Sequence, residues 1–190
     1  MRRTVLLAGL GLLAVALAAC SPLAIVNRLT PSDTYTVTTD LAYGPEARDR
    51  LDLYRPRESA DRPAPRGGYP VVVFFYGGNW ISGERADYKF VGEALAARGV
   101  LTLVVDYRLY PETTYPGFLE DSALAVAWSL EHAKALGGDP KRVFAMGHSA
   151  GGYNAAMLAL DARWLNAVGH APAELRGWIG LAGAYEFFPL

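Results

Sequence analysis

The chain has 190 residues, with 18 Lys and Arg against 19 Asp and Glu, three His and a single Cys. Its net charge of −1 excludes a broad basic surface of the kind that binds nucleic acid. Apolar residues make up 52% and charged residues 19%, a composition that excludes a disordered chain and leaves room for one domain with a substantial core.

The N-terminus has the pattern of an export signal. Arg2 and Arg3 precede an uncharged, mostly apolar stretch over residues 5–18, which is short for a membrane span and typical of a signal peptide. The segment Leu17-Ala18-Ala19-Cys20 resembles the lipobox of bacterial lipoprotein signals. The resemblance implies cleavage before Cys20 and a diacylglycerol on its thiol. The alternative is an ordinary signal peptide in which Cys20 is incidental.

These features predict three segments: a signal peptide over residues 1–19, a tether over residues 20–33 and a globular domain over residues 34–190. Two or more acyl chains give stable anchoring, so we expect the protein at a membrane. Asp after the cysteine would suggest retention at the inner membrane; Ser21 stands there instead. It favours the outer membrane or the periplasmic face of the bacterial cell envelope. The single Cys has no partner for an internal disulfide.

Beyond the tether, strand patterns alternate with helix patterns. β-Branched and aromatic residues predict two early strands, and a Pro-rich loop follows them. Uninterrupted apolar runs, as at 71–76, are typical of strands buried on both faces. The predicted strands are at 34–38, 50–54, 71–76, 100–105, 142–146 and 177–181, and the predicted helices at 84–98, 118–136 and 150–160. This alternation predicts an α/β fold with a mostly parallel sheet.

A candidate nucleophile lies between the strand at 142–146 and the helix at 150–160. The segment Gly147-His148-Ser149-Ala150-Gly151 matches G-x-S-x-G in the strand–turn–helix context that a nucleophile elbow requires. Its glycines permit a sharp turn that exposes the Ser149 hydroxyl, and the following helix directs N–H groups toward a developing oxyanion. The alternatives are a glycine-rich turn with a solvated serine, or a phosphate loop. Neither G-K-[ST] nor G-x-G-x-x-G accompanies the motif, which disfavours the phosphate loop.

A second motif, Tyr76-Gly77-Gly78-Asn79-Trp80, ends the strand at 71–76. Together the two motifs resemble those of the α/β-hydrolase esterases of the hormone-sensitive lipase and feruloyl-esterase-like groups, which carry H-G-G-x-W at this place. The resemblance implies an α/β-hydrolase fold with helices on both faces of the sheet. It also implies an oxyanion hole built from Gly77, Gly78, Asn79 and Ala150. Tyr76 stands where the family has His, so we expect altered loop support and substrate shape.

The resemblance extends over most of the chain from about residue 45. Segments 105–112, 138–142 and 183–186 resemble further family motifs. By that alignment the acidic and basic residues in and near these segments are structural or gating residues and not members of the catalytic triad: Asp106, Arg108, Asp121 and Glu186. We expect a substrate pocket that includes Tyr76, Trp80 and His148, although a core position suits Trp80 equally well.

The sequence contains only half of the expected mechanism. A serine nucleophile needs a base, normally His, oriented by a carboxylate. In this fold both follow the serine in the chain, and His170 is the only later His. The resemblance places the base much further on, so we expect His170 in a loop, His148 with its ring turned away from the reaction and His132 on a helix surface. The chain is therefore expected to be a fragment or an early-terminated copy that lacks the last strands and the catalytic acid and base.

The sequence predicts a serine carboxylesterase that acts on short-chain or aryl esters through an acyl-enzyme at Ser149. The alternatives are an arylformamidase or peptidase of the same fold, or an inactive remnant that acts only as a tethered binding protein. No cluster of Cys, His and Asp suggests a metal site, and no cofactor is expected. The expected partners are a small ester and, through the lipid on Cys20, a membrane, but no nucleic acid. The oligomeric state is left open.

Overall fold

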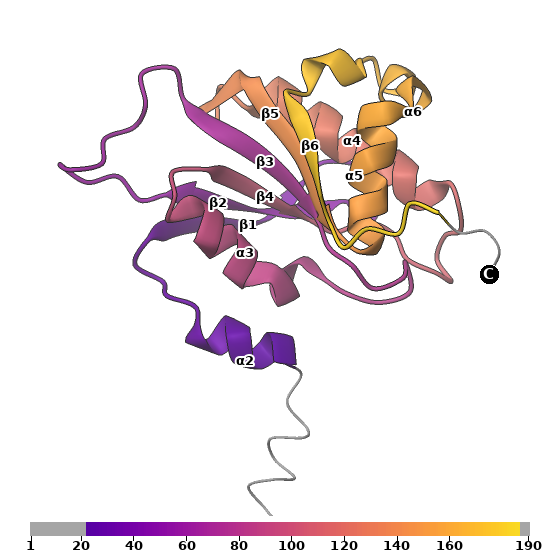
Figure 1. The fold of residues 1–190 in the computed structure, drawn as a ribbon, viewed down its shortest axis with the longest axis horizontal. Coiled ribbons are helices and arrows are strands. Elements are labelled where there is room, and N and C mark those ends of the chain that lie inside the picture. Colours follow the sequence, from indigo (N-terminus) through magenta and orange to yellow (C-terminus); the bar gives the residue numbers. More distant parts are fainter. Residues whose placement is uncertain (1–21, 187–190) are drawn as a thin grey trace, which may run out of the picture.

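The computed structural model of the protein describes residues 22–186, which contain a six-stranded sheet with helices on both faces (Figure 1). The strand order across this sheet is β1-β2-β4-β3-β5-β6. The strands are β1 (Tyr35–Ala42), β2 (Arg50–Pro56), β3 (Tyr69–Phe75), β4 (Leu101–Val105), β5 (Gly138–His148) and β6 (Gly177–Leu181). The predicted signal peptide and Cys20 lie outside the described residues.

The sheet is parallel except at one edge. β4, β3, β5 and β6 form three parallel pairs, whereas β1 and β2 add an antiparallel edge next to β4. Every residue of β4 is buried and so is all of β3 except Pro70, as expected for strands covered by helices on both faces. The predicted α/β class with a mostly parallel sheet is therefore confirmed.

The helices pack in two groups. Helices α4, α5 and α6 contact one another on one face of the sheet, and α3 covers β2 and β4 on the other face (Figure 1). Helix α2 lies outside α3, at the periphery of the domain. The helical elements are α2 (Pro22–Leu29), η1 (Arg85–Tyr88), α3 (Lys89–Ala96), α4 (Gly117–His132), α5 (Ala150–Leu160), α6 (Ala162–Ala167) and η2 (Pro172–Glu174).

The largest difference from the sequence prediction is at residues 22–29. This part of the predicted tether forms helix α2 and is docked on the domain. The side-chain amide of Asn27 donates to the carbonyl oxygen of Ala86 (2.8 Å), and its oxygen accepts from the N–H of Phe90 (3.2 Å). These contacts join segments far apart in the chain, so local sequence patterns do not reveal them.

Other elements differ at their ends. The predicted helix at 84–98 is divided into η1 and α3, and α4 ends at His132 instead of residue 136. Strand β5 begins at Gly138, which pairs with Tyr69 ahead of a register shift, four residues before its predicted start. The short elements α6 and η2 were not predicted. Within residues 22–186, no helix combines the length and the apolar character needed to cross a bilayer.

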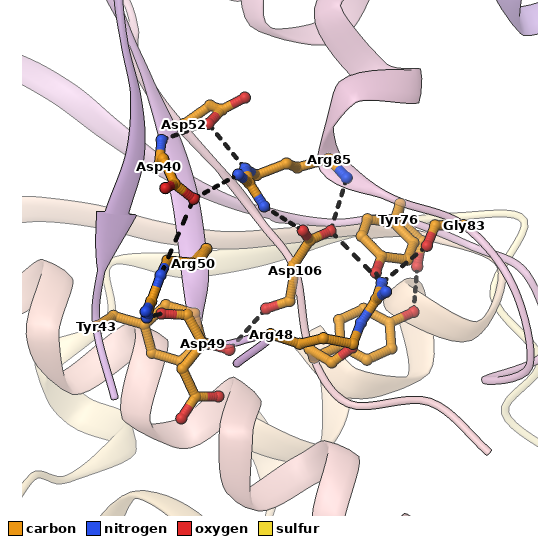
Figure 2. A network of polar contacts seen from close by, with 11 residues as sticks. Asp40, Tyr43, Arg48, Asp49, Arg50, Asp52, Tyr76, Gly83, Arg85 and Asp106 are labelled. Atoms are coloured by element: carbon orange, nitrogen blue, oxygen red, sulfur yellow. Dashed lines mark hydrogen bonds and ion pairs between the residues drawn. The ribbon is translucent and has the colours of Figure 1, made fainter. Parts of the chain in front are cut away.

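A network of charged groups joins the antiparallel edge to the centre of the sheet (Figure 2). The guanidinium of Arg85 donates to Asp52 Oδ1 (2.8 Å), to Asp40 Oδ1 (2.8 Å) and to Asp106 Oδ2. The backbone N–H of Arg85 also donates to Asp106 Oδ1 (2.7 Å). The side chains of Asp52 and Asp106 are only 8% and 7% exposed, so both carboxylates need a nearby cation. Arg85 supplies it to both, and Asp106 also lies 3.7 Å from Arg48.

We therefore expect Arg85→Ala to lower the free energy of unfolding by about 3–5 kcal/mol, because Asp52 loses its cation and Asp106 keeps only Arg48, at 3.7 Å. Urea unfolding at pH 7 measures this. The matched control is Arg163→Ala, which removes an ion pair with Asp161 from an arginine that is 73% exposed. It should leave the urea midpoint close to that of the parent, because solvent screens this exposed pair. Equal losses in the two variants would contradict a special role for Arg85.

Candidate active site

Ser149 occupies a strained turn between β5 and α5. Its backbone angles are φ 52° and ψ −119°, a region that residues with a Cβ atom rarely adopt. The N–H of Ser149 donates to the carbonyl oxygen of Leu181 in β6 (2.8 Å), and its own carbonyl oxygen accepts from the N–H of Tyr153 (3.2 Å). The turn is thus held from both sides, which is the geometry of a nucleophile elbow.

The glycines of the motif are required by close contact between backbone segments. A Cβ atom on Gly147 would overlap the carbonyl oxygen of Gly151, and a Cβ on Gly151 would overlap that of Phe75 in β3. Helix α5 therefore begins directly against the ends of β3 and β5. Its N-terminus, with Ala150 at the first position, lies beside Ser149.

The loop after β3 packs against Ser149. Gly78, Asn79 and Trp80 all have positive φ, at 133°, 54° and 59°. A Cβ atom on Gly77 would lie 2.9 Å from both the Cβ of Ser149 and Nδ1 of His148, so no larger residue fits between loop and elbow. The two motifs that the sequence identified separately are therefore in direct contact.

The loop and the elbow border an open cavity of about 370 Å³, which is lined by Leu23, Gly77, Gly78, Asn79, Ser82, Gly83, Asp87, Tyr88, His148 and Ser149. The N–H of Gly77 donates a long hydrogen bond to the hydroxyl of Tyr88 (3.4 Å). The backbone N–H groups of Gly78, Asn79 and Ala150 are consequently the better candidates for binding an oxyanion.

Tyr76 supports the loop from below and does not line the cavity. It is fully buried and stacks between Tyr107 and Tyr88, with ring centroids 4.7 Å and 5.8 Å away. Burial raises the pKa of Tyr76, so the side chain stays a neutral phenol. The structure therefore differs from the predicted place of Tyr76 in the substrate pocket, because the ring fills the core beneath the loop.

Arg48 fixes both ends of this loop and was not identified from the sequence. Its Nη2 atom donates to the hydroxyl of Tyr76 (2.6 Å) and to the carbonyl oxygen of Gly83 (2.9 Å), and its Nε donates to the carbonyl oxygen of Tyr107 (2.9 Å) (Figure 2). The one sequence feature that points to Arg48 is Tyr76. A phenol in place of the family's imidazole needs a different hydrogen-bond partner, and Arg48 is that partner.

Trp80 anchors the far side of the loop to the helices. Its indole N–H donates to Asn154 Oδ1 (2.9 Å), and its ring stacks on Phe118 at 5.1 Å and meets the edge of Tyr153 at 5.5 Å. It is not among the residues that line the cavity. Of the two readings open for Trp80, the structure favours the core position.

None of the three histidines forms a hydrogen bond with Ser149. His148 lines the cavity, with Nδ1 at 3.5 Å from the hydroxyl of Tyr88. His170 lies between Glu131 and Glu174, at 3.5 Å and 3.2 Å. It precedes β6, which begins beside Phe144 and ends beside His148, so His170 lies at the opposite end of the sheet. His132 Nδ1 is 2.8 Å from the carbonyl oxygen of Trp128 within α4.

The carboxylates that the sequence assigned to structural roles are engaged elsewhere. Asp106 pairs with Arg85, and Asp121 is buried and bound by both the side chain and the backbone N–H of Arg108. Glu186 is exposed. In the part of the chain that the structure describes, no group of three His, Cys, Asp or Glu side chains is arranged to hold a metal ion.

Residues 51–170 match the model of the BD-FAE family. The probable isoprenylcysteine alpha-carbonyl methylesterase ICME of Oryza sativa subsp. japonica is 34% identical over 154 residues, covering 79% of this chain and 36% of that protein. The carboxylesterase NlhH of Mycobacterium tuberculosis is 43% identical over 102 residues, covering 53% of this chain and 32% of that protein. The chain thus spans about a third of the length of these curated relatives.

Among solved structures, the hyperthermophilic esterase of the archaeon Pyrobaculum calidifontis is similar, with a TM-score of 0.66 and 28% identity. The match covers 85% of this chain and 47% of that one. A bacterial heroin esterase has the same TM-score at 27% identity, covering 93% and 50%. These matches confirm the α/β-hydrolase fold that the two motifs predicted.

Gly151 provides a test of the elbow geometry. We expect Gly151→Ala to lower the free energy of unfolding by about 3 kcal/mol, because the added methyl group collides with the backbone of β3. Gly177→Ala in β6 is the control, since its Cβ would meet only the ring of Phe144 at 3.6 Å. It should change stability by less than about 1 kcal/mol in the same urea titration. A tolerated Gly151→Ala would show that the elbow is looser than described.

Proposed function

Because the chain belongs to the BD-FAE family, we propose that it is a carboxylic ester hydrolase that forms an acyl-enzyme on Ser149. The observation that carries this proposal is the contact between the strained Ser149 turn and the glycine loop at 77–79. A lone G-x-S-x-G turn has several uses. A serine held in this conformation beside a second set of backbone N–H groups suits the attack on an acyl carbon.

The reaction follows from this geometry. The Ser149 oxygen adds to the ester carbonyl carbon while a base takes the hydroxyl proton, and the carbonyl oxygen becomes an oxyanion. Backbone N–H groups of Gly78, Asn79 and Ala150 stabilise that charge. The intermediate then expels the alcohol, which receives the proton from the base, and leaves an ester on Ser149. Water, deprotonated by the same base, releases the acid and restores the serine.

We propose that the histidine base and its carboxylate lie outside residues 22–186. Within those residues Ser149 has no histidine partner, and His170 is held by two glutamates at the far end of the sheet. Acylation without a base is slow but not zero, because the oxyanion site alone still favours the transition state. Hydrolysis of the acyl-enzyme also needs the base, so the acylated protein should accumulate.

The proposed substrates are short-chain or aryl esters. The cavity beside Ser149, at about 370 Å³, suits a small acyl group. Relatives named as a carboxylesterase and a methylesterase favour an ester over the amide bonds of arylformamidase or peptidase substrates. A lipid on Cys20 is proposed to hold the protein on the bacterial cell envelope, at the outer membrane or the periplasmic face.

The acyl-enzyme can be tested directly. After exposure to p-nitrophenyl acetate, we expect the protein to gain one acetyl group that peptide mass spectrometry places on Ser149. Ser149→Ala should abolish this modification, whereas Ser59→Ala, in the exposed loop before β3, should retain it. A chain that acquires no acetyl group on Ser149 would contradict the esterase proposal and favour the inactive, tethered binding protein.

Lipidation is tested separately by metabolic labelling with an alkyne fatty acid in a bacterial host. The protein should be labelled, and Cys20→Ala should lose the label completely because the chain has no other cysteine. Equal labelling of that variant would contradict the lipoprotein proposal.

A further inference from the structure

Helix α2 forms part of the wall of the candidate active site. Leu23, in its first turn, lines the cavity that contains Ser149. Leu23 also lines an adjoining apolar cavity of about 270 Å³ together with Tyr88 and Phe90. The hydrogen bonds of Asn27 to residues in η1 and α3 hold the helix in this position.

The outward side of α2 is apolar. Leu23 and Asn27, four residues apart, share the inner side, and both are half-buried. Ile25, Val26 and Leu29 are 39%, 44% and 77% exposed. A helix that packs on a domain normally turns its polar residues outward, so this arrangement is the reverse of the usual one.

The position of α2 in the chain identifies the occupant of that apolar side. Only Ser21 separates the helix from Cys20, the predicted site of lipid attachment. In the sequence, Cys20 is three residues before Leu23, which lines the cavity. Arg28 in the last turn adds a cation suited to anionic headgroups.

We propose that α2 is an interfacial helix, with Ile25, Val26 and Leu29 inserted in the lipid surface and Leu23 turned toward the Ser149 cavity. The cavity then opens beside the membrane. Insofar as the proposed esterase function holds, the substrates are amphiphilic esters that reside at the bilayer surface and present a small acyl group. Lipid attachment alone would leave the orientation of the cavity relative to the membrane undefined. Insertion of α2 would fix that orientation.

The first experiment is vesicle flotation. The chain from residue 20 with Cys20→Ser carries no lipid and should float with vesicles of phosphatidylethanolamine and phosphatidylglycerol, and less with phosphatidylcholine alone. Leu29→Asn should weaken partition about ten-fold. The matched control is Leu160→Asn, at the end of α5 remote from Ser149, because that leucine is similarly exposed (72% against 77%). The control should bind like the parent.

The second experiment reports orientation. The Cys20→Ser chain has no cysteine, so a single new one can carry an environment-sensitive dye. With vesicles, the dye at Leu29→Cys and at Ser82→Cys, on the cavity rim, should shift to the blue, while the dye at Leu160→Cys should not. Flotation does not require the nucleophile, so Ser149→Ala should bind like the parent. The outcome is therefore independent of whether the esterase proposal holds.

Three results would overturn the inference. The first is no flotation with either vesicle, and the second is equal loss of binding in Leu29→Asn and Leu160→Asn. The third is a dimer in sedimentation that Leu29→Asn converts to a monomer, which would make a second copy of the chain the occupant of this side of α2.

Discussion

The carboxylate of Asp106, at the end of β4, is the constraint on which the site depends. It receives the backbone and side-chain N–H groups of Arg85, and it lies 3.7 Å from Arg48, which in turn holds Tyr76 and Gly83 (Figure 2). Through Arg48, one buried charge determines where the loop after β3 begins and ends. The antiparallel edge contributes to the position of the glycine loop, because Asp40 and Asp52 bind Arg85, and Arg48 comes from the connection between β1 and β2.

The turn at Ser149 differs from the charged network around Asp106, because its main feature is backbone strain and not charge compensation. Positive φ at Ser149, Asn79 and Trp80 persists only where the surroundings determine the backbone more strongly than local preference does. At Ser149 that surrounding is the carbonyl oxygen of Leu181 in β6 and the first turn of α5. Ser149 is thus held by the strand and the helix that flank it, and the strained turn depends on both being in place.

The sequence predicted what depends on local pattern and missed what depends on distant partners. Buried apolar runs located β3 and β4, the glycine spacing located the turn at Ser149, and the predicted helix at 150–160 coincides with α5. The start of η1 has no local sequence signal, because the N–H of Arg85 binds Asp106, twenty-one residues later. Arg48 lies in a loop without a motif. Helix α2 has only eight residues, and its apolar side chains face outward. Its sequence therefore predicts a tether, and only the contacts of Asn27 with distant residues show that it is docked.

The two ends of the parallel strands carry different parts of the molecule. Parallel strands bring their carboxyl ends to one edge of the sheet, and there the loop after β3 meets the turn after β5. The same loop leads into η1, on which α2 packs. Helix α2 therefore lies near that edge as well. The opposite edge holds the start of β6, with His170 tied to two glutamates just before it. Helix α2 and Ser149 therefore lie at the same edge of the sheet, because the segment that holds α2 continues directly from the glycine loop after β3.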